Sequence, residues 1–87
     1  MSVAHVNPDD LRKLQSAVKT SQTEIDQAIR KLQSAFQKAD WKDAARQQFE
    51  GKLNEAVSGV RQTKSKLAEL EPILAKKSAE VAQYLGR

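Results

Sequence analysis

The side chains that could carry acid–base or metal chemistry are few in this 87-residue chain. His5 is the only histidine and there is no cysteine, so a metal site would need carboxylates alone. The sequence contains no Glu-x-x-His pair, no nucleophile elbow and no glycine-rich phosphate loop. Most carboxylates fall outside the apolar stripes described below: Asp9, Asp10, Glu24, Asp26, Glu50, Glu55, Glu69, Glu71 and Glu80. We therefore expect no enzyme, no cofactor and no metal.

Composition favours a helical chain, and the distribution of charge argues against nucleic-acid binding. Hydrophobic residues make up 39% and charged residues 30%, with only 3 Gly and 2 Pro, which suits long helices. The formal net charge of +4 is shared evenly between the two halves. Nucleic-acid binders concentrate their basic residues on one face, so we expect no nucleic-acid partner. We interpret the closest grouping as a solvated helix face: Arg61, Lys64, Lys66, Lys76 and Lys77.

No targeting or membrane segment is expected. No apolar run approaches the ~20 residues that a bilayer-spanning helix needs. The first residues lack the charged and apolar regions of a secretory signal peptide. Export by the ordinary signal-peptide route is therefore not expected.

The chain should form a single all-α domain over residues 1–87, and its first helix should span about 8–39. Asn7 can cap this helix, and Pro8 suits its first position. Ile29 and Phe36 widen the apolar stripe to one side. The stripe itself follows heptad spacing: Leu11, Leu14, Val18, Ile25, Leu32 and Ala39, with Ser21, Ala28 and Ala35 in the alternate position.

A short turn at about 40–43 should join this helix to a second, antiparallel one at about 44–85. Asp40 and Asp43 are both plausible caps for the second helix. Pro72 lies outside its apolar stripe and predicts a kink rather than a domain boundary. The second stripe consists of Leu53, Val60, Leu67, Leu74 and Val81, spaced by sevens, with Phe49, Ala56, Leu70 and Tyr84 beside them.

Folding at this turn should leave apolar surface uncovered. Residue 39 would lie near residue 43, and residue 11 near residue 71. The C-terminal end of the second helix would therefore extend about fifteen residues beyond the start of the first helix. That overhang would leave Ile73, Leu74, Val81, Tyr84 and Leu85 without a partner in the hairpin. Two helices also bury little apolar area, which favours a dimeric four-helix bundle. We predict an interface of Leu14, Val18, Ile25, Leu32, Leu53, Val60, Leu67, Leu74 and Val81.

Trp41 is the most informative single residue, because it lies near the turn with Phe36 before it and Phe49 after it. One interpretation is structural: the indole closes the end of the bundle and fixes the turn. The other is functional: the indole is offered to a partner, since aromatic residues anchor protein contacts. The two interpretations are compatible and the sequence does not choose between them.

The turn resembles that of the WXG family, the small early-secretory-antigen-like proteins of type VII (ESX) secretion systems. Trp41 matches the Trp of the family's Trp-x-Gly motif, Ala45 the small residue after it and Phe49 the later aromatic residue, whereas Asp43 stands at the Gly position. Tyr84 matches the Tyr of the family's Tyr-x-x-x-Asp/Glu tail, but no acidic residue follows it. Chain length, the absence of cysteine and a mid-chain Trp turn between two helices also fit.

The resemblance implies a protein that pairs with itself or with a related helical hairpin. It also implies cytoplasmic synthesis followed by export without a signal peptide, either as a secreted substrate or as a carrier for a larger effector. A secretion ATPase or that effector would be a further partner, and Trp41, Asp43, Phe49 and Tyr84 would contribute to recognition. Two alternatives stay open: a cytosolic helical adaptor or chaperone, and a subunit of a helical secretion needle.

Overall fold

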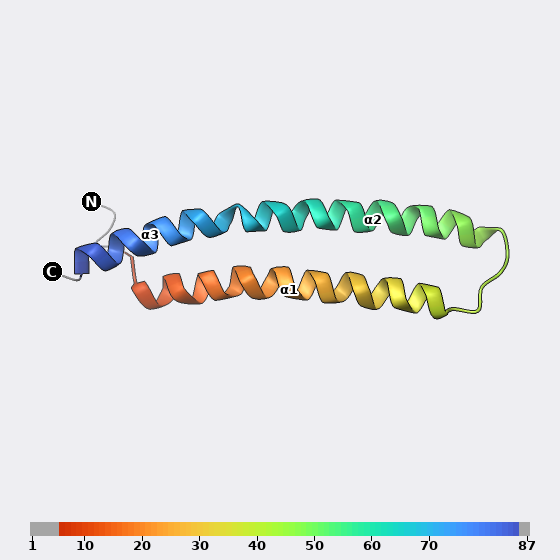
Figure 1. Ribbon diagram of the computed structural model, residues 1–87, viewed down its shortest axis with the longest axis horizontal. Helices are drawn as coiled ribbons and strands as arrows, with labels where there is room; N and C mark the ends of the chain where they lie inside the picture. Colours follow the sequence, from red (N-terminus) through yellow and green to blue (C-terminus); the bar gives the residue numbers. More distant parts are fainter. Residues whose placement is uncertain (1–5, 86–87) are drawn as a thin grey trace.

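The chain folds into a long, antiparallel helical hairpin. The computed structural model describes residues 6–85, which form α1 (Pro8–Lys38), α2 (Ala45–Ala68) and α3 (Leu70–Leu85), with no strand among them. In Figure 1, α2 and α3 follow one another and run back along α1, so that the start of α1 and the end of α3 lie at the same end. The rod measures 67 × 17 × 14 Å. The predicted all-α helical hairpin is confirmed.

The first helix begins where the sequence predicts. The Asn7 side-chain oxygen accepts the backbone N–H groups of Asp9, at 2.8 Å, and Asp10, at 3.3 Å. These two donors belong to the first turn, where no carbonyl within the helix can reach them. Pro8 has no N–H and therefore leaves no donor unpaired at the first helical position.

The connector between α1 and α2 is longer than expected, because residues 39–44 replace the predicted turn at 40–43. Asp43, and not Asp40, caps the second helix: its carboxylate accepts the N–H of Ala45 at 3.0 Å, and its backbone carbonyl accepts that of Arg46 at 3.1 Å. Asp40 is exposed and lies 3.8 Å from the amine of Lys42. The structure thus decides between the two caps that the sequence leaves open.

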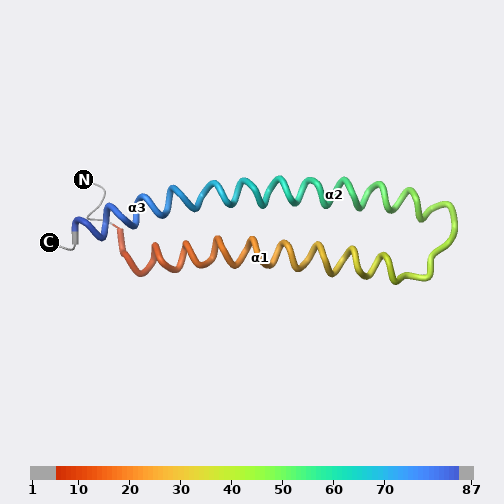
Figure 2. Tube along the Cα trace, viewed as in Figure 1, coloured from red at the N-terminus to blue at the C-terminus, as the bar shows by residue number. Residues whose placement is uncertain are grey.

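The second arm of the hairpin is helical apart from an interruption at one residue, Glu69, whose backbone angles stay helical (φ −66°, ψ −19°). The interruption falls at Glu69, three residues before Pro72. Pro72 cannot donate to the carbonyl of Ala68, and its ring would clash with that carbonyl in a regular helix. As the third residue of α3, Pro72 sits where its missing N–H costs nothing. Figure 2 shows the trace leaning toward the start of α1 beyond this point.

The predicted overhang of the second helix is wrong. Val81 is only 2% exposed and lines the same hollow as Leu11, and the hydroxyl of Ser78 lies 3.4 Å from the amide oxygen of Gln15. Position 11 therefore pairs near 81 and not near 71. The connector leads away from α1, so α2 begins beyond the end of α1 (Figure 1). Side chains also lean toward the N-terminus of their own helix, which adds to this offset in an antiparallel pair.

The core is discontinuous along the rod. One cluster lies toward the connector and contains Ile29, Phe36, Leu53 and Val57, with Ile25 and Trp41 packed against it. Other buried side chains lie toward the open end: Leu11, Val18 and Val81. Polar side chains join the helices between these two groups. The fully buried apolar side chains therefore form two groups, and half-buried aliphatic residues and polar contacts line the seam between them.

Candidate interaction surface

The two long sides of the hairpin differ in chemistry. On α1, Leu11 and Ile25 face the other arm along the line here called the seam. Three residues after them, Leu14 and Ala28 lie on one flank of the seam. One residue after them, Arg12 and Asp26 lie on the other flank. The same spacing from Leu53 and Leu67 gives Ala56 and Leu70 on one flank, and Asn54 and Ala68 on the other. Antiparallel helices that face each other place equivalent flanks on the same side. Accordingly, Gln33 lines one hollow with Asn54 and Arg61, and Arg12 lines another with Ala82.

One side, here called the apolar side, leaves large hydrophobic groups in solvent. Its larger members are between 40% and 50% exposed: Leu14, Leu32, Phe49, Val60 and Leu70. Small residues lie among them, namely Ala28, Ala35 and Ala56, all exposed. Isolated exposed hydrophobic residues are ordinary, but a run along both elements of a hairpin marks an interaction surface. Small residues within the run would let the backbone of another helix approach closely.

Cross-helix polar contacts, here called the polar ladder, close the other flank of the seam. The amine of Lys64 lies 2.6 Å from the carboxylate of Asp26, and the amide of Gln22 donates to the carboxylate of Glu71 at 2.9 Å. The hydroxyl of Ser78 donates to the amide oxygen of Gln15 at 3.4 Å. These contacts run beside the half-buried aliphatic residues of the seam, Ile25, Leu67 and Leu74.

The ladder contains a carboxylate, that of Asp26, whose pKa is shifted by its surroundings. The hydrogen bond from Lys64 holds the pKa of Asp26 below its usual range, and the charges of Lys64, Arg30 and Arg61 act in the same direction. Partial removal of the carboxylate from water opposes this effect. The ionised form is therefore the one that the fold stabilises.

An aromatic cluster lies at the connector end. The ring of Phe49 stands 5.3 Å from those of both Phe36 and Trp41, centre to centre. The Arg46 guanidinium lies 4.3 Å from the centre of the Phe36 ring and donates to the carbonyl of Trp41 at 3.2 Å. The indole N–H donates to Asp43 at 2.7 Å, so its polar atom already has a partner in the chain. This geometry supports the structural interpretation of Trp41, while half-exposed Phe49 remains open to a partner.

The residues predicted for a dimer interface divide into three groups. Val18, Leu53 and Val81 are buried within the hairpin, and Ile25, Leu67 and Leu74 are half-buried along its seam. The exposed group is Leu14, Leu32 and Val60. Sequence reasoning missed the polar ladder, although Gln15 and Gln22 on α1, and Lys64, Glu71 and Ser78 on α2 and α3, repeat at the same seven-residue spacing as the apolar residues.

Tyr84 and Trp41 lie at opposite ends of the rod, since Tyr84 is in the last turn of α3 (Figure 1). Tyr84 is 58% exposed. The two positions after α3 and the N-terminal His5 lie outside the described residues. Trp41 and Tyr84 therefore cannot contribute to one compact site within a single hairpin.

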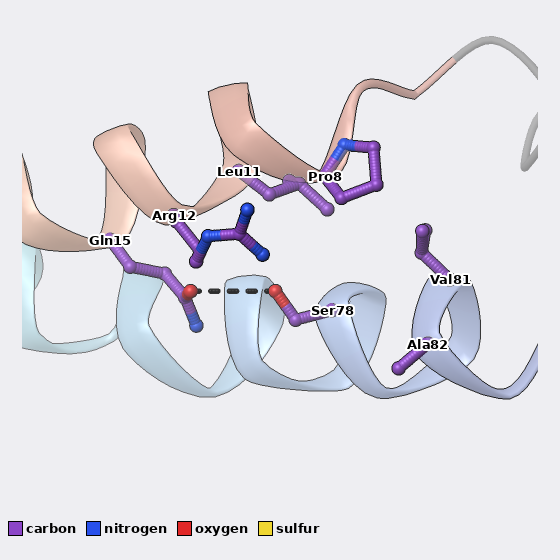
Figure 3. A pocket seen from close by; sticks show the side chains of 7 residues that line it. All are labelled: Pro8, Leu11, Arg12, Gln15, Ser78, Val81 and Ala82. Carbon is purple, nitrogen blue, oxygen red and sulfur yellow. Dashed lines mark hydrogen bonds between the residues drawn. The ribbon is translucent and has the colours of Figure 1, made fainter. Parts of the chain in front are cut away.

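The open end of the rod carries a shallow hollow of about 300 Å³ between α1 and α3. Figure 3 shows Arg12 and Gln15 on one wall, with Ser78 and Ala82 on the other. Within residues 6–85 no group of three or more His, Cys, Asp or Glu side chains could hold a metal ion. None of the helices in that range combines the length and the apolar character needed to cross a membrane.

Comparison of the chain with known protein families, with curated proteins and with solved structures found no match in any of the three. Membership of the WXG family therefore stays a prediction from the residues of the turn. What the structure adds is a helical hairpin with one apolar side and an aromatic cluster at the connector.

Proposed function

We propose that this chain is an interaction module that pairs with a second helical hairpin through its apolar side to form a four-helix bundle. The supporting observation is the row of half-exposed residues along that side, which includes Leu14, Leu32 and Val60. The rod is 67 Å long and at least 14 Å wide, so one whole side exceeds the about 800 Å² that each partner contributes to a standard interface. Covering it would remove these side chains from water on both hairpins, which is favourable.

A more specific proposal is that the module belongs to the WXG type and serves a type VII-like secretion system. The Trp41 turn between two antiparallel helices and the exposed Tyr84 near the end of α3 support it. The chain would be made in the cytoplasm and exported in the folded state, or would carry a larger effector paired with it. A secretion ATPase is the further partner of this proposal.

The pairing test changes one residue on each side of the rod. Leu32→Glu places a charge on the apolar side, and Gln37→Glu adds the same charge at an exposed position that lines a hollow on the opposite side. Light scattering at tens of micromolar should give a dimer mass for the unchanged chain and for Gln37→Glu, and a monomer mass for Leu32→Glu. Equal masses for the two variants would contradict the assignment of the interface.

The export test compares culture supernatants with and without the secretion ATPase in a host that makes the system. Loss of the chain from the supernatant without the ATPase supports the WXG-type proposal. An equal distribution would remove secretion as the function and leave the pairing proposal standing. A Trp41→Ala chain that keeps its partner would favour the adaptor alternative, in which the Trp turn has only a structural role.

A further inference from the structure

Two arginines face each other across the seam on the polar side, which is the side of the hairpin opposite the apolar side. The amine of Lys64 lies 2.6 Å from the carboxylate of Asp26, so these residues are at the same level of the rod. Arg30 follows Asp26 by four residues, and Arg61 precedes Lys64 by three. In an antiparallel pair both steps lead one helical turn toward the connector. Arg30 and Arg61 therefore lie opposite each other, one turn beyond the ion pair.

No free carboxylate balances the charge of these two arginines. Both are exposed, and within residues 6–85 neither of them forms an ion pair. Asp26 is the carboxylate next to them, and it already accepts a hydrogen bond from Lys64. Three cations thus surround one carboxylate, and the charges of Arg30 and Arg61 both lower its pKa. Because facing like charges repel, an added negative group would be stabilised here.

The other carboxylates of the polar side lie with partners of their own. Toward the open end, Glu71 accepts the amide of Gln22 at 2.9 Å. Toward the connector, Glu50 lines a hollow together with Arg46, which precedes it by four residues on the same helix. Neither carboxylate lines the hollow that Arg61 borders. The positive surplus is therefore greatest around Arg30 and Arg61.

The open hollow beside Arg61, of about 430 Å³ between α1 and α2, contains hydrogen-bond donors and no carboxylate. Guanidinium groups bind carboxylates through two parallel N–H groups. Amides and hydroxyls can donate or accept, so they suit both a carboxylate and the backbone of a peptide. The residues that line the hollow with such groups are Gln33, Asn54, Ser58, Gln62 and Ser65.

We infer that the polar side carries a second binding surface, centred on Arg30 and Arg61, for an acidic segment of another protein. Clusters of arginine recognise acidic motifs in this way. The surface lies opposite the apolar side, so it stays accessible when two hairpins pair as proposed above. It is also complete in a single hairpin, because all of its residues come from one chain.

A nucleic acid fits this side less well than an acidic segment. Its successive phosphates would require free cations along the rod. The next arginines of this side are already engaged: Arg12 with the carboxylate of Asp9, and Arg46 with the ring of Phe36. The free guanidinium groups are thus concentrated at one level, which suits one or two carboxylates.

Peptide binding tests the inference, with dye-labelled octaglutamate as the probe and fluorescence anisotropy as the readout. Replacing Arg30→Gln together with Arg61→Gln should weaken binding at least about tenfold, because both guanidinium groups are lost. The matched control, Lys31→Gln with Lys66→Gln, removes the same charge from exposed positions that do not line the hollow. The control should weaken binding less than about twofold. Circular dichroism should show unchanged helix content in both variants.

Equal weakening by the two double variants would overturn the inference, because net charge alone would then explain the attraction. An unchanged chain that does not bind octaglutamate would overturn it too, as would tighter binding of an oligothymidine of equal charge. Amide chemical shifts locate the site independently of any variant. Adding octaglutamate should move the signals of Ser58 and Ser65 and leave those of Ala28 and Ala35 on the apolar side in place. The opposite pattern would place the peptide on the wrong side of the hairpin.

Discussion

The carboxylate of Asp43 joins the aromatic cluster to the first turn of α2. It accepts the indole N–H of Trp41 at 2.7 Å, and the same oxygen accepts the backbone N–H of Ala45 at 3.0 Å. One side chain therefore orients the ring and caps the helix. Asp43 stands at the position where the Trp-x-Gly motif has glycine, and glycine has no side chain that could make either contact. In this chain the geometry of the turn depends on a carboxylate.

Replacing Asp43 with Ala should lower the free energy of unfolding by about 1 kcal/mol, because a helix cap is lost. The fluorescence of Trp41 should also change, since its N–H partner is removed. Asp43→Asn should retain most of the stability, because the amide oxygen can still accept the N–H of Ala45. Urea unfolding followed by fluorescence measures both effects. The control is Asp40→Ala, an exposed residue, and an equal loss in this variant would contradict the choice of cap.

The cluster near the connector should carry much of the stability of the single chain. Leu53→Ala removes a buried side chain and should cost about 2–5 kcal/mol. Ile73→Ala removes an apolar side chain that is 64% exposed and should change the free energy of unfolding by less than about 0.5 kcal/mol. Both are measured by urea denaturation at low protein concentration, so that association does not contribute. Similar losses in the two variants would place the core elsewhere.

The burial of Val81 distinguishes the observed alignment of the two arms from one in which the second arm extends far beyond the start of the first. Val81→Ala should cost about 2 kcal/mol, because Val81 is the most deeply buried side chain of the described residues. Tyr84→Ala removes a larger but exposed group one turn later and should cost far less. Thermal unfolding at low concentration compares the two. An unchanged midpoint for Val81→Ala would mean that α3 does not pack against the start of α1.

The ion pair of the polar ladder should make stability depend on pH. The pKa of Asp26 is lower in the folded chain than in the unfolded one, so its contribution is present above the unfolded value of about 3.9. That contribution is lost as the pH falls through the folded pKa. The unchanged chain should exceed Asp26→Asn in free energy of unfolding at pH 7, and the difference should shrink below about pH 4. Asp40→Asn is the matched control, and a difference for Asp26→Asn that is constant with pH would refute the prediction.

Local structure was predictable from this sequence where short-range chemistry determines it. Asn7 and Pro8 mark the start of α1 because both act within one turn of helix. The same reasoning could not choose between Asp40 and Asp43, since that choice depends on where the chain turns in three dimensions. Pro72 was the right signal for an interruption, but the break lies at Glu69 because the clash of the ring falls on the preceding turn.

The alignment of the two arms, and therefore which apolar residues stay exposed, was less predictable for a physical reason. The aliphatic residues repeat by sevens on both arms, so the repeat alone does not show which residues of the two arms face each other. The alignment depends on contacts between residues far apart in sequence. Ile29 and Phe36 pack with Leu53 and Val57, while Gln22 and Lys64 contact Glu71 and Asp26. A search for apolar periodicity alone ignores these contacts. It therefore assigned Val81 to a partner chain, whereas the structure buries it in the hairpin.

Sedimentation equilibrium of the unmodified chain over a range of concentrations tests most directly whether its apolar side pairs with a second hairpin. The mean mass should rise from the 9.7 kDa of one chain toward twice that value by tens of micromolar. Added salt should preserve the association, because apolar burial drives it. A mass that stays at 9.7 kDa throughout this range would contradict self-pairing.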